Sequence, residues 1–318
     1  VAVSEYIDPE VLKFDAVIFD EASQIRTEEA VSSILRAKQV IVVGDDKQLP
    51  PTNNFQRYFD DEDKENDEDY ESLLTECGKF MRFFSLKWHY RSQDESLIAF
   101  SNKEFYDFDL VTFPNPVRSK DRGVHFCHVT DGVYEPGKRR NLSEAKKIVD
   151  LCLYHAQSSE QSLGIIAFNE KQADAIQEEI DSSSEEHRIL EDLQENPKRF
   201  FITNLESVQG EERDVIIISF CFARDATGKF KHYFGALNKP GGERRLNVAI
   251  TRARKKLILV SSIRSYDLKP SGKSELQIQK LQDYFAYVER GGHFEKGANN
   301  SASEVVTDSE LIENICSL

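Results

Sequence analysis

The sequence predicts an α/β protein built on two parallel sheets, one partial and one complete. Two short apolar runs near the start, residues 16–19 and 40–43, are rich in β-branched residues and too short for helices. They are typical of buried strands in a parallel sheet. From residue 124 onward strand patterns alternate with helix patterns, and this alternation predicts a second, mostly parallel sheet.

The first unit is expected to end at residue 86. Besides its two strands it has a predicted helix over residues 27–38, with apolar residues on one face, and a second helix over residues 72–83. Residues 60–71 contain nine acidic residues and one lysine, so they predict a solvated insertion, because like charges at that density repel. A nucleic-acid mimic is the alternative interpretation of this acidic run.

The second unit is expected to extend from residue 87 to residue 292. Its predicted strands cover residues 124–129, 163–168, 201–205, 215–222 and 257–262. Its predicted helices cover residues 93–105, 143–155, 169–180, 246–253 and 274–290. Residues 293–318 are expected to form a linker and the start of a further segment.

Composition argues against several classes of protein. The formal charge is −15, of which residues 60–71 contribute −8; this balance argues weakly against general affinity for nucleic acid but leaves room for a local basic groove. No run approaches the ~20 apolar residues that span a bilayer, and the first residues of the sequence do not have the pattern of a signal peptide. The five scattered cysteines match no disulfide or zinc pattern, which favours a reducing, cytoplasmic setting.

Acidic residues follow both strands of the first unit. Asp20 and Glu21 come directly after the first apolar run, and Asp45, Asp46 and Gln48 come shortly after the second. Ligands bind at the carboxyl ends of strands in open parallel sheets. A carboxylate pair there can hold hydrated Mg²⁺ with one member and activate water with the other, while a nearby glutamine can reach a terminal phosphate or its attacking water. For the first pair alone, a strand end followed by a helix cap is an equal alternative.

These two segments, Asp-Glu-Ala-Ser-Gln and Gly-Asp-Asp-Lys-Gln-Leu-Pro-Pro, resemble motifs II and III of the superfamily 1 helicases. The most similar branch is the one typified by the nonsense-mediated-decay helicase and its bacterial relatives. The resemblance implies P-loop NTPase sheets of the RecA-like kind. It also implies that Asp20 binds Mg²⁺ through water, that Glu21 acts as the catalytic base, and that Gln48 senses the phosphate.

Three later segments resemble further motifs of that family, in the family's order. Tyr90-Arg91 resembles motif IV, whose tyrosine and arginine serve adenine and the terminal phosphate. The run Gln-Gly-Glu-Glu-Arg resembles motif V and places Glu212 at the ribose and phosphate end of the nucleotide. The run Asn-Val-Ala-Ile-Thr-Arg-Ala-Arg resembles motif VI, in which Arg252 is an arginine finger from the second domain. Taken alone, these segments also fit a surface arginine, a polar link between strands and a basic helix end.

The phosphate-binding sequence Gly-x-x-x-x-Gly-Lys-Ser/Thr, the family's motif I, does not occur in residues 1–318. The backbone N–H groups and lysine of that loop ordinarily supply much of the affinity for phosphates. We therefore expect the chain to be a piece of a longer protein. We also expect residues 1–318 alone to bind ATP weakly and hydrolyse it negligibly.

The resemblance implies an ATP-dependent helicase or translocase core, which couples ATP hydrolysis with Mg²⁺ to movement along single-stranded DNA or RNA. One rival is an ATP-gated nucleic-acid clamp or scaffold module in a larger defence or repair protein. Another is a P-loop ATPase that acts on protein. Nucleic acid is expected to cross both sheets, near the residues after Gly44 and near residues 203–207.

Overall fold

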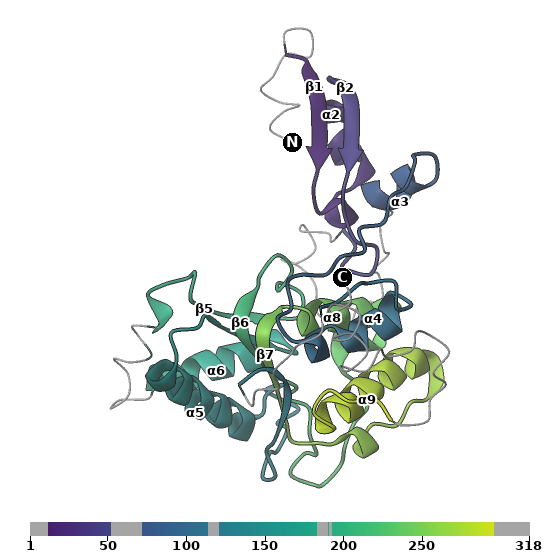
Figure 1. Cartoon of the computed structure of the whole chain (residues 1–318). Coiled ribbons are helices and arrows are strands. Elements are labelled where there is room, and N and C mark those ends of the chain that lie inside the picture. The colour runs from purple at the N-terminus through teal and green to yellow at the C-terminus, as the bar shows by residue number, and fades with distance from the viewer. Residues whose placement is uncertain (1–11, 52–71, 114–120, 183–189, 191–192, 296–318) are drawn as a thin grey trace, which may run out of the picture.

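The computed structural model describes residues 12–51, 72–113, 121–182, 190 and 193–295, and these residues form two α/β units (Figure 1). The acidic run at residues 60–71 and most of the expected linker at residues 293–318 lie outside the described residues. No helix in the described ranges is both long enough and apolar enough to cross a membrane.

The first unit contains a two-stranded parallel sheet. β1 (Phe14–Phe19) pairs with β2 (Ala37–Val42), and Val17 lies opposite Val40. Figure 1 shows that the carboxyl ends of both strands point toward the larger unit. The acidic residues that follow the two strands therefore lie at the junction of the units.

Two short helices pack against this sheet. α2 (Thr27–Ile34) connects the two strands, and α3 (Leu73–Gly78) follows them in the chain. The predictions of helices over residues 27–38 and 72–83 were too long at the carboxyl end. The first helix ends early because Ala37 already belongs to β2. The second ends where the chain becomes exposed, so no packing sustains a longer helix.

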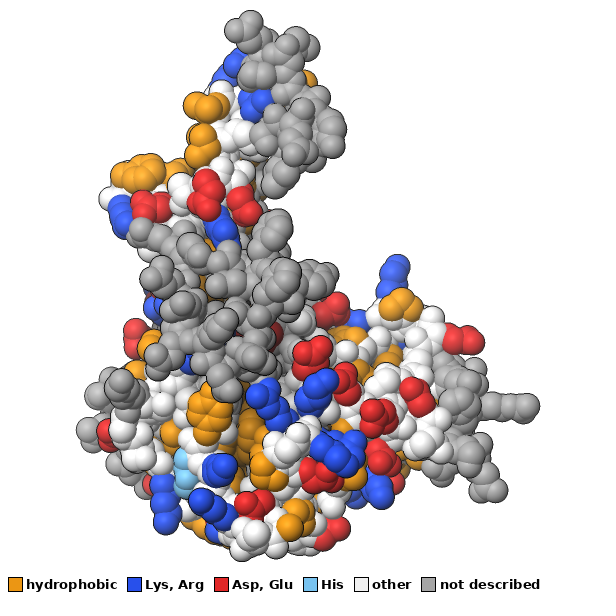
Figure 2. Space-filling model, turned by 180° about the vertical axis from the view of Figure 1, so that it is seen from behind, with side chains coloured by type: hydrophobic (Ala, Val, Ile, Leu, Met, Phe, Trp, Pro, Cys, Tyr) orange, Lys and Arg blue, Asp and Glu red, His pale blue; other side chains and the backbone are white. Residues whose placement is uncertain are grey.

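The strands of the first unit are only partly buried, which corrects the prediction of buried strands. Ile18 and Ile41 lie opposite each other on one face and are 66% and 40% exposed. Phe19 and Val42 lie on the other face and pack against a small core formed with the helices. Within the described residues only one face is covered, and Figure 2 shows hydrophobic side chains on the surface of this unit.

The second unit contains five strands in the spatial order β3-β7-β6-β4-β5. The strands are β3 (Gly123–His128), β4 (Leu163–Ala167), β5 (Phe200–Asn204), β6 (Arg213–Ser219) and β7 (Ala253–Ser261). Every neighbouring pair is parallel, with Ile165 opposite Ile217 and Ile216 opposite Leu257. The predicted α/β class and the second parallel sheet are therefore confirmed.

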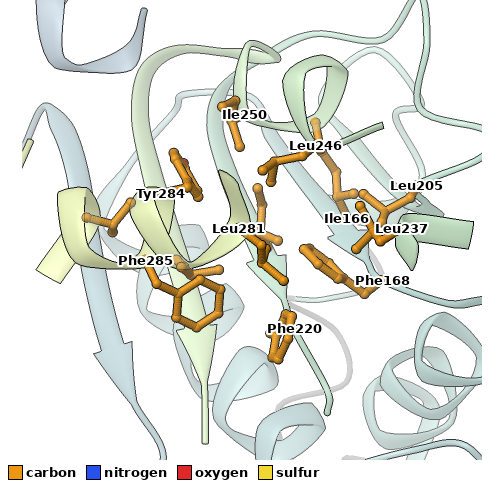
Figure 3. Packing of buried hydrophobic residues seen from close by; sticks show 14 of the residues in the cluster. Ile166, Phe168, Leu205, Phe220, Leu237, Leu246, Ile250, Leu281, Tyr284 and Phe285 are labelled. Carbon is orange, nitrogen blue, oxygen red and sulfur yellow. The ribbon is translucent and has the colours of Figure 1, made fainter. Parts of the chain in front are cut away.

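Helices cover both faces of the second sheet (Figure 1). They are α4 (Ala99–Phe105), α5 (Leu142–Ser158), α6 (Glu170–Ser182), α8 (Gly242–Ile250) and α9 (Glu275–Glu289). Successive strand residues point to opposite faces. Accordingly, Ile217 lies in the core beneath α5 and α6, whereas Ile216 lies in the core beneath α4, α8 and α9. Figure 3 shows the latter core, in which the rings of Phe220 and Phe285 meet edge to face at 4.9 Å between centroids.

One helix boundary in the second unit matters for the site. The helix predicted over residues 246–253 instead begins at Gly242 and ends at Ile250. Its end is closed by Thr251, whose hydroxyl donates to the carbonyl oxygen of Asn247 at 2.8 Å. Ala253 already belongs to β7, so Arg252 stands at the turn between helix and strand.

We propose that the boundary between the units lies at residues 86 and 87. The N–H of Val111 donates to the carbonyl of Lys87 at 2.7 Å, and the N–H of His89 donates to the carbonyl of Val111 at 3.0 Å. The Lys87 ammonium also pairs with the Asp109 carboxylate. These contacts attach the chain after residue 86 to the second unit.

A buried carboxylate ties α5 to the carboxyl ends of β6 and β7. One oxygen of Glu144 accepts hydrogen bonds from the N–H and hydroxyl of Ser262, at 2.9 and 2.8 Å. The other accepts from the hydroxyl of Ser219 at 3.0 Å and from the N–H of Cys221 at 2.8 Å. Burial raises the pKa of Glu144 to about 7, although these hydrogen bonds oppose the rise.

This raised pKa predicts that the contribution of Glu144 to stability falls as the pH rises. Between pH 4.5 and 7 the folded chain holds a proton on Glu144 that the unfolded chain has released. Glu144 alone should decrease the free energy of unfolding by about 2–3 kcal/mol from pH 5 to pH 7.5, and this contribution to the slope should be absent in Glu144→Gln. Urea unfolding at several pH values measures it. Equal slopes in the two proteins would contradict the prediction.

Candidate functional site

Asp20 and Glu21 form a tight turn after β1. The N–H of Glu21 donates to Oδ1 of Asp20 at 2.9 Å, and Glu21 has a left-handed backbone with φ 50° and ψ 39°. Such a conformation is uncommon for a residue with a side chain and costs of order 1 kcal/mol or more. Gly44 after β2 lies against this turn, since a Cβ there would stand 3.0 Å from the N of Ser23. The chain segments that follow both strands are therefore packed together.

The Asp45 carboxylate fixes the orientation of Gln48. Oδ2 of Asp45 accepts from Nε2 of Gln48 at 2.9 Å, and Oδ1 accepts from the N–H of Lys47 at 2.9 Å. An ionised carboxylate can only accept, so the amide nitrogen must face Asp45. The amide oxygen of Gln48 is enclosed and has no hydrogen-bond partner within the described structure. Gln48 therefore retains an unused acceptor.

On the second unit, Glu212 holds two arginines. Its Oε2 lies 2.8 Å from Nε of Arg91, and its Oε1 lies 3.7 Å from Nη1 of Arg254. All three side chains are 38–39% exposed, so the pairs add little stability. Their effect is orientation, because the bond at Nε leaves the end of the planar guanidinium of Arg91 available for a phosphate.

Arg252 is buried beside this group. It is 2% exposed, and its guanidinium donates to the carbonyl of Val248 at 2.7 Å and to the hydroxyl of Thr251 at 3.1 Å. Burial, followed by the charge of Arg91, lowers the pKa of Arg252 to about 10, while Glu21 acts in the opposite direction. Two neighbouring guanidinium groups, one of them desolvated, favour the binding of an anion between them.

Glu21 meets these residues across the junction of the units. Nε2 of Gln209 donates to Oε2 of Glu21 at 3.2 Å, and Glu21 and Glu212 both interact electrostatically with Arg252. The structure thus brings together four residues that lie far apart in the sequence: Glu21, Arg91, Glu212 and Arg252. A carboxylate on one side and arginines on the other are suited to binding a polyanion and activating water beside it.

The remaining predicted residues lie at the edges of this group. Tyr90 precedes Arg91 in the chain, and its side chain is 84% exposed. Asp20 is exposed beside Glu21 and offers hard oxygen donors of the kind that Mg²⁺ prefers. The described residues include no cluster of three or more His, Cys, Asp or Glu side chains that could hold a metal ion. The roles predicted for these two residues, like those predicted for the other site residues, remain proposals.

Sequence reasoning missed two residues that link the units. Oδ2 of Asp45 also accepts from the hydroxyl of Tyr106 at 2.7 Å, and Nδ2 of Asn247 donates to that hydroxyl at 3.1 Å. Asn247 is fully buried on an otherwise apolar helix face, and a buried amide requires partners, so it could have been noticed. Tyr106 carries no such signal, because a tyrosine at a helix end is ordinary.

Comparisons with known proteins identify related sequences. A family model described as an AAA domain matches residues 70–264, and a second model with the same description matches residues 3–54.

Relatives include an uncharacterized ATP-dependent helicase of Mycoplasma genitalium, 35% identical over 293 residues, with 87% of this chain and 25% of the relative covered. The regulator of nonsense transcripts 1 homolog of Drosophila melanogaster is 29% identical over 272 residues, with 79% of this chain and 21% of the relative covered. A solved complex of Arterivirus nonstructural protein 10 (helicase) with DNA matches at 14% identity and a TM-score of 0.39, covering 79% of this chain and 41% of that one. The chain spans about a quarter of the length of the Mycoplasma and Drosophila relatives.

Proposed function

The chain belongs to the AAA domain family of the superfamily 1 helicases, and on that premise we propose that its two units form the core of an ATP-dependent helicase or translocase. The observation that carries this proposal is the approach of Glu21 to Arg252 across the junction of the units, where Gln209 donates to Glu21 at 3.2 Å and Arg91 lies close enough to Arg252 to lower its pKa. Hydrolysis of a nucleotide held there would depend on how the two units sit against each other.

In this proposal Tyr90 and Arg91 hold the nucleotide from the side of the second unit. The exposed ring of Tyr90 is free to stack on adenine, and Arg91 is oriented by Glu212 toward the phosphates. Glu212 also contacts the ribose end of the nucleotide. Asp20 would hold Mg²⁺ through water, and the ion would neutralise part of the phosphate charge.

The hydrolysis step combines groups from both units. Glu21 acts as a base that takes a proton from the attacking water. Gln48, with its nitrogen held by Asp45, presents its oxygen as an acceptor for that water beside the terminal phosphate. Arg252, together with Arg91, neutralises charge that develops on the transferring phosphoryl group.

Closing and reopening of the units around ATP would shift them along a nucleic-acid strand. The partner is single-stranded DNA or RNA, held by phosphate contacts and base stacking near the residues after Gly44 and near residues 203–207. We also propose that the protein is cytoplasmic and that its full chain carries further domains. Residues 1–318 contain no Gly-x-x-x-x-Gly-Lys-Ser/Thr loop, so we propose that they bind ATP weakly and hydrolyse it negligibly alone.

The test is the ATPase rate of the full-length protein, measured with and without single-stranded DNA and RNA. We expect one of the two polymers to stimulate hydrolysis by about tenfold or more, because it would drive closure of the units. Strand displacement is measured in parallel. Hydrolysis without stimulation would favour an ATPase that acts on protein. ATP-dependent binding of nucleic acid without movement would favour the clamp or scaffold.

A further inference from the structure

The Gln48 loop of the first unit is docked on the second unit. Residues 45–50 follow β2, yet Leu49 is 4% exposed and belongs to the same core cluster as Phe105 and Leu246 of the second unit. Nδ2 of Asn247 also donates to the carbonyl of Lys47 at 3.0 Å. The loop therefore begins in one unit and is held by the other.

Tyr106 supplies the side-chain bond that reaches Gln48. Its hydroxyl donates to Oδ2 of Asp45 at 2.7 Å, and the same oxygen accepts from Nε2 of Gln48 at 2.9 Å. Burial, followed by the neighbouring Asp45, raises the pKa of Tyr106 above its ordinary value, so the hydroxyl keeps its proton and donates. Asn247 donates to that hydroxyl from the other side at 3.1 Å. Asp45 thus stands between Tyr106 of the second unit and Gln48 of the first.

The position of Tyr106 is held by its own unit. It follows α4, and the next two residues, Asp107 and Phe108, have left-handed backbones with φ 50° and 60°. Asn102 closes this turn, since its side chain donates to the carbonyl of Leu110 at 2.9 Å and accepts from the N–H of Leu110 at 3.0 Å. The hydroxyl of Tyr106 is therefore presented by a fixed turn and moves with the second unit.

We propose that Tyr106 is a positioning residue that makes the orientation of Gln48 depend on docking of the second unit. It acts through Asp45. When the second unit moves away, Asp45 loses the Tyr106 bond, and the loop loses the support of Asn247 and the core that surrounds Leu49. Gln48 then loses the fixed partner that orients its amide. The docking is independent of the reaction, but the consequence for hydrolysis rests on the role proposed above for Gln48.

The first measurement needs no nucleotide. The N–H of Lys47 donates to Oδ1 of Asp45 and the N–H of Gln48 donates to its carbonyl, so exchange of these two amide hydrogens reports whether the loop is docked. In full-length Tyr106→Phe we expect both amides to exchange roughly tenfold faster or more, the factor for losing one hydrogen bond to a charged acceptor.

The chain offers two matched controls. Tyr287 is buried and its hydroxyl donates to the neutral carbonyl of Ser96 at 2.8 Å within the second unit, so Tyr287→Phe removes a buried hydroxyl bond away from the loop. Tyr284 is buried and its hydroxyl has no partner within the described structure, so Tyr284→Phe removes a hydroxyl without a bond. Neither control should change exchange at Lys47 and Gln48. Equal acceleration in Tyr287→Phe would overturn the proposal, because it would reflect general loosening.

The second measurement is steady-state hydrolysis by the same full-length variants. We expect Tyr106→Phe to lower kcat for ATP by about tenfold and to leave KM within about twofold of wild type. The reason is that Gln48 is proposed to act on the attacking water rather than on the binding of ATP. Faster exchange with unchanged kcat would overturn the positioning role. If the wild-type protein hydrolyses no ATP, the proposed function fails, while the exchange experiment still decides whether Tyr106 docks the loop.

Discussion

Glu21→Gln in the full-length protein is expected to lower kcat for ATP by ~10²-fold or more while leaving nucleotide affinity nearly unchanged. Glutamine keeps the size of the side chain but cannot accept a proton from water. Glu21 is suited to this role because it lies at the end of β1, where it faces the second unit. Its Oε2 accepts a hydrogen bond from the side-chain amide of Gln209 in that unit at 3.2 Å. Single-turnover hydrolysis and equilibrium binding of ATP together measure the effect.

The matched control for this variant is Glu76→Gln. Glu76 is also in the first unit, but its carboxylate pairs with Lys79 at 3.0 Å, three residues along the chain and away from the site. This control should hydrolyse ATP at the wild-type rate. If Glu21→Gln turned over within a factor of about two of wild type, Glu21 would have no part in the chemical step.

Arg252→Lys is expected to lower kcat by ~10²-fold or more, with a smaller change in affinity for ATP. Lysine keeps the positive charge but lacks the planar fork, and an arginine that neutralises a transferring phosphoryl group contributes mainly in the transition state. The guanidinium of Arg252 also holds the carbonyl of Val248 and the hydroxyl of Thr251. Melting temperature must therefore be measured alongside kinetics, so that a loss of folding is not mistaken for a loss of catalysis.

The control for this variant is Arg199→Lys. Arg199 pairs with Glu160 at 3.1 Å on the surface of the second unit, and neither residue belongs to the site. A purely structural role for Arg252 predicts a lower melting temperature with an unchanged kcat. The proposed role predicts a large fall in kcat even for protein that remains fully folded at the assay temperature.

The sequence by itself determined the α/β class and the types of residue that follow the strands of the first unit. Asp20 and Glu21 follow β1 directly, so their place at the edge of the sheet depends only on where the apolar run stops. The alternation of strand and helix patterns likewise predicted the second sheet. The prediction of buried strands in the first unit was wrong, because the pattern of an apolar strand does not reveal how many faces of its sheet are covered. Ile18 is exposed although the residues around it in the sequence have the apolar pattern of a buried strand.

Only the tertiary structure decided which distant residues meet. Tyr106 and Asp45 are 61 positions apart in the chain, and Asn247 and Lys47 are 200 apart. No periodicity or spacing encodes such contacts, because they depend on how the two units pack on each other. The same docking places Leu49 in a core that its own strand does not build. The residue types at the strand ends could therefore be predicted, whereas the bonds that orient Gln48 follow from the packing of one unit on the other.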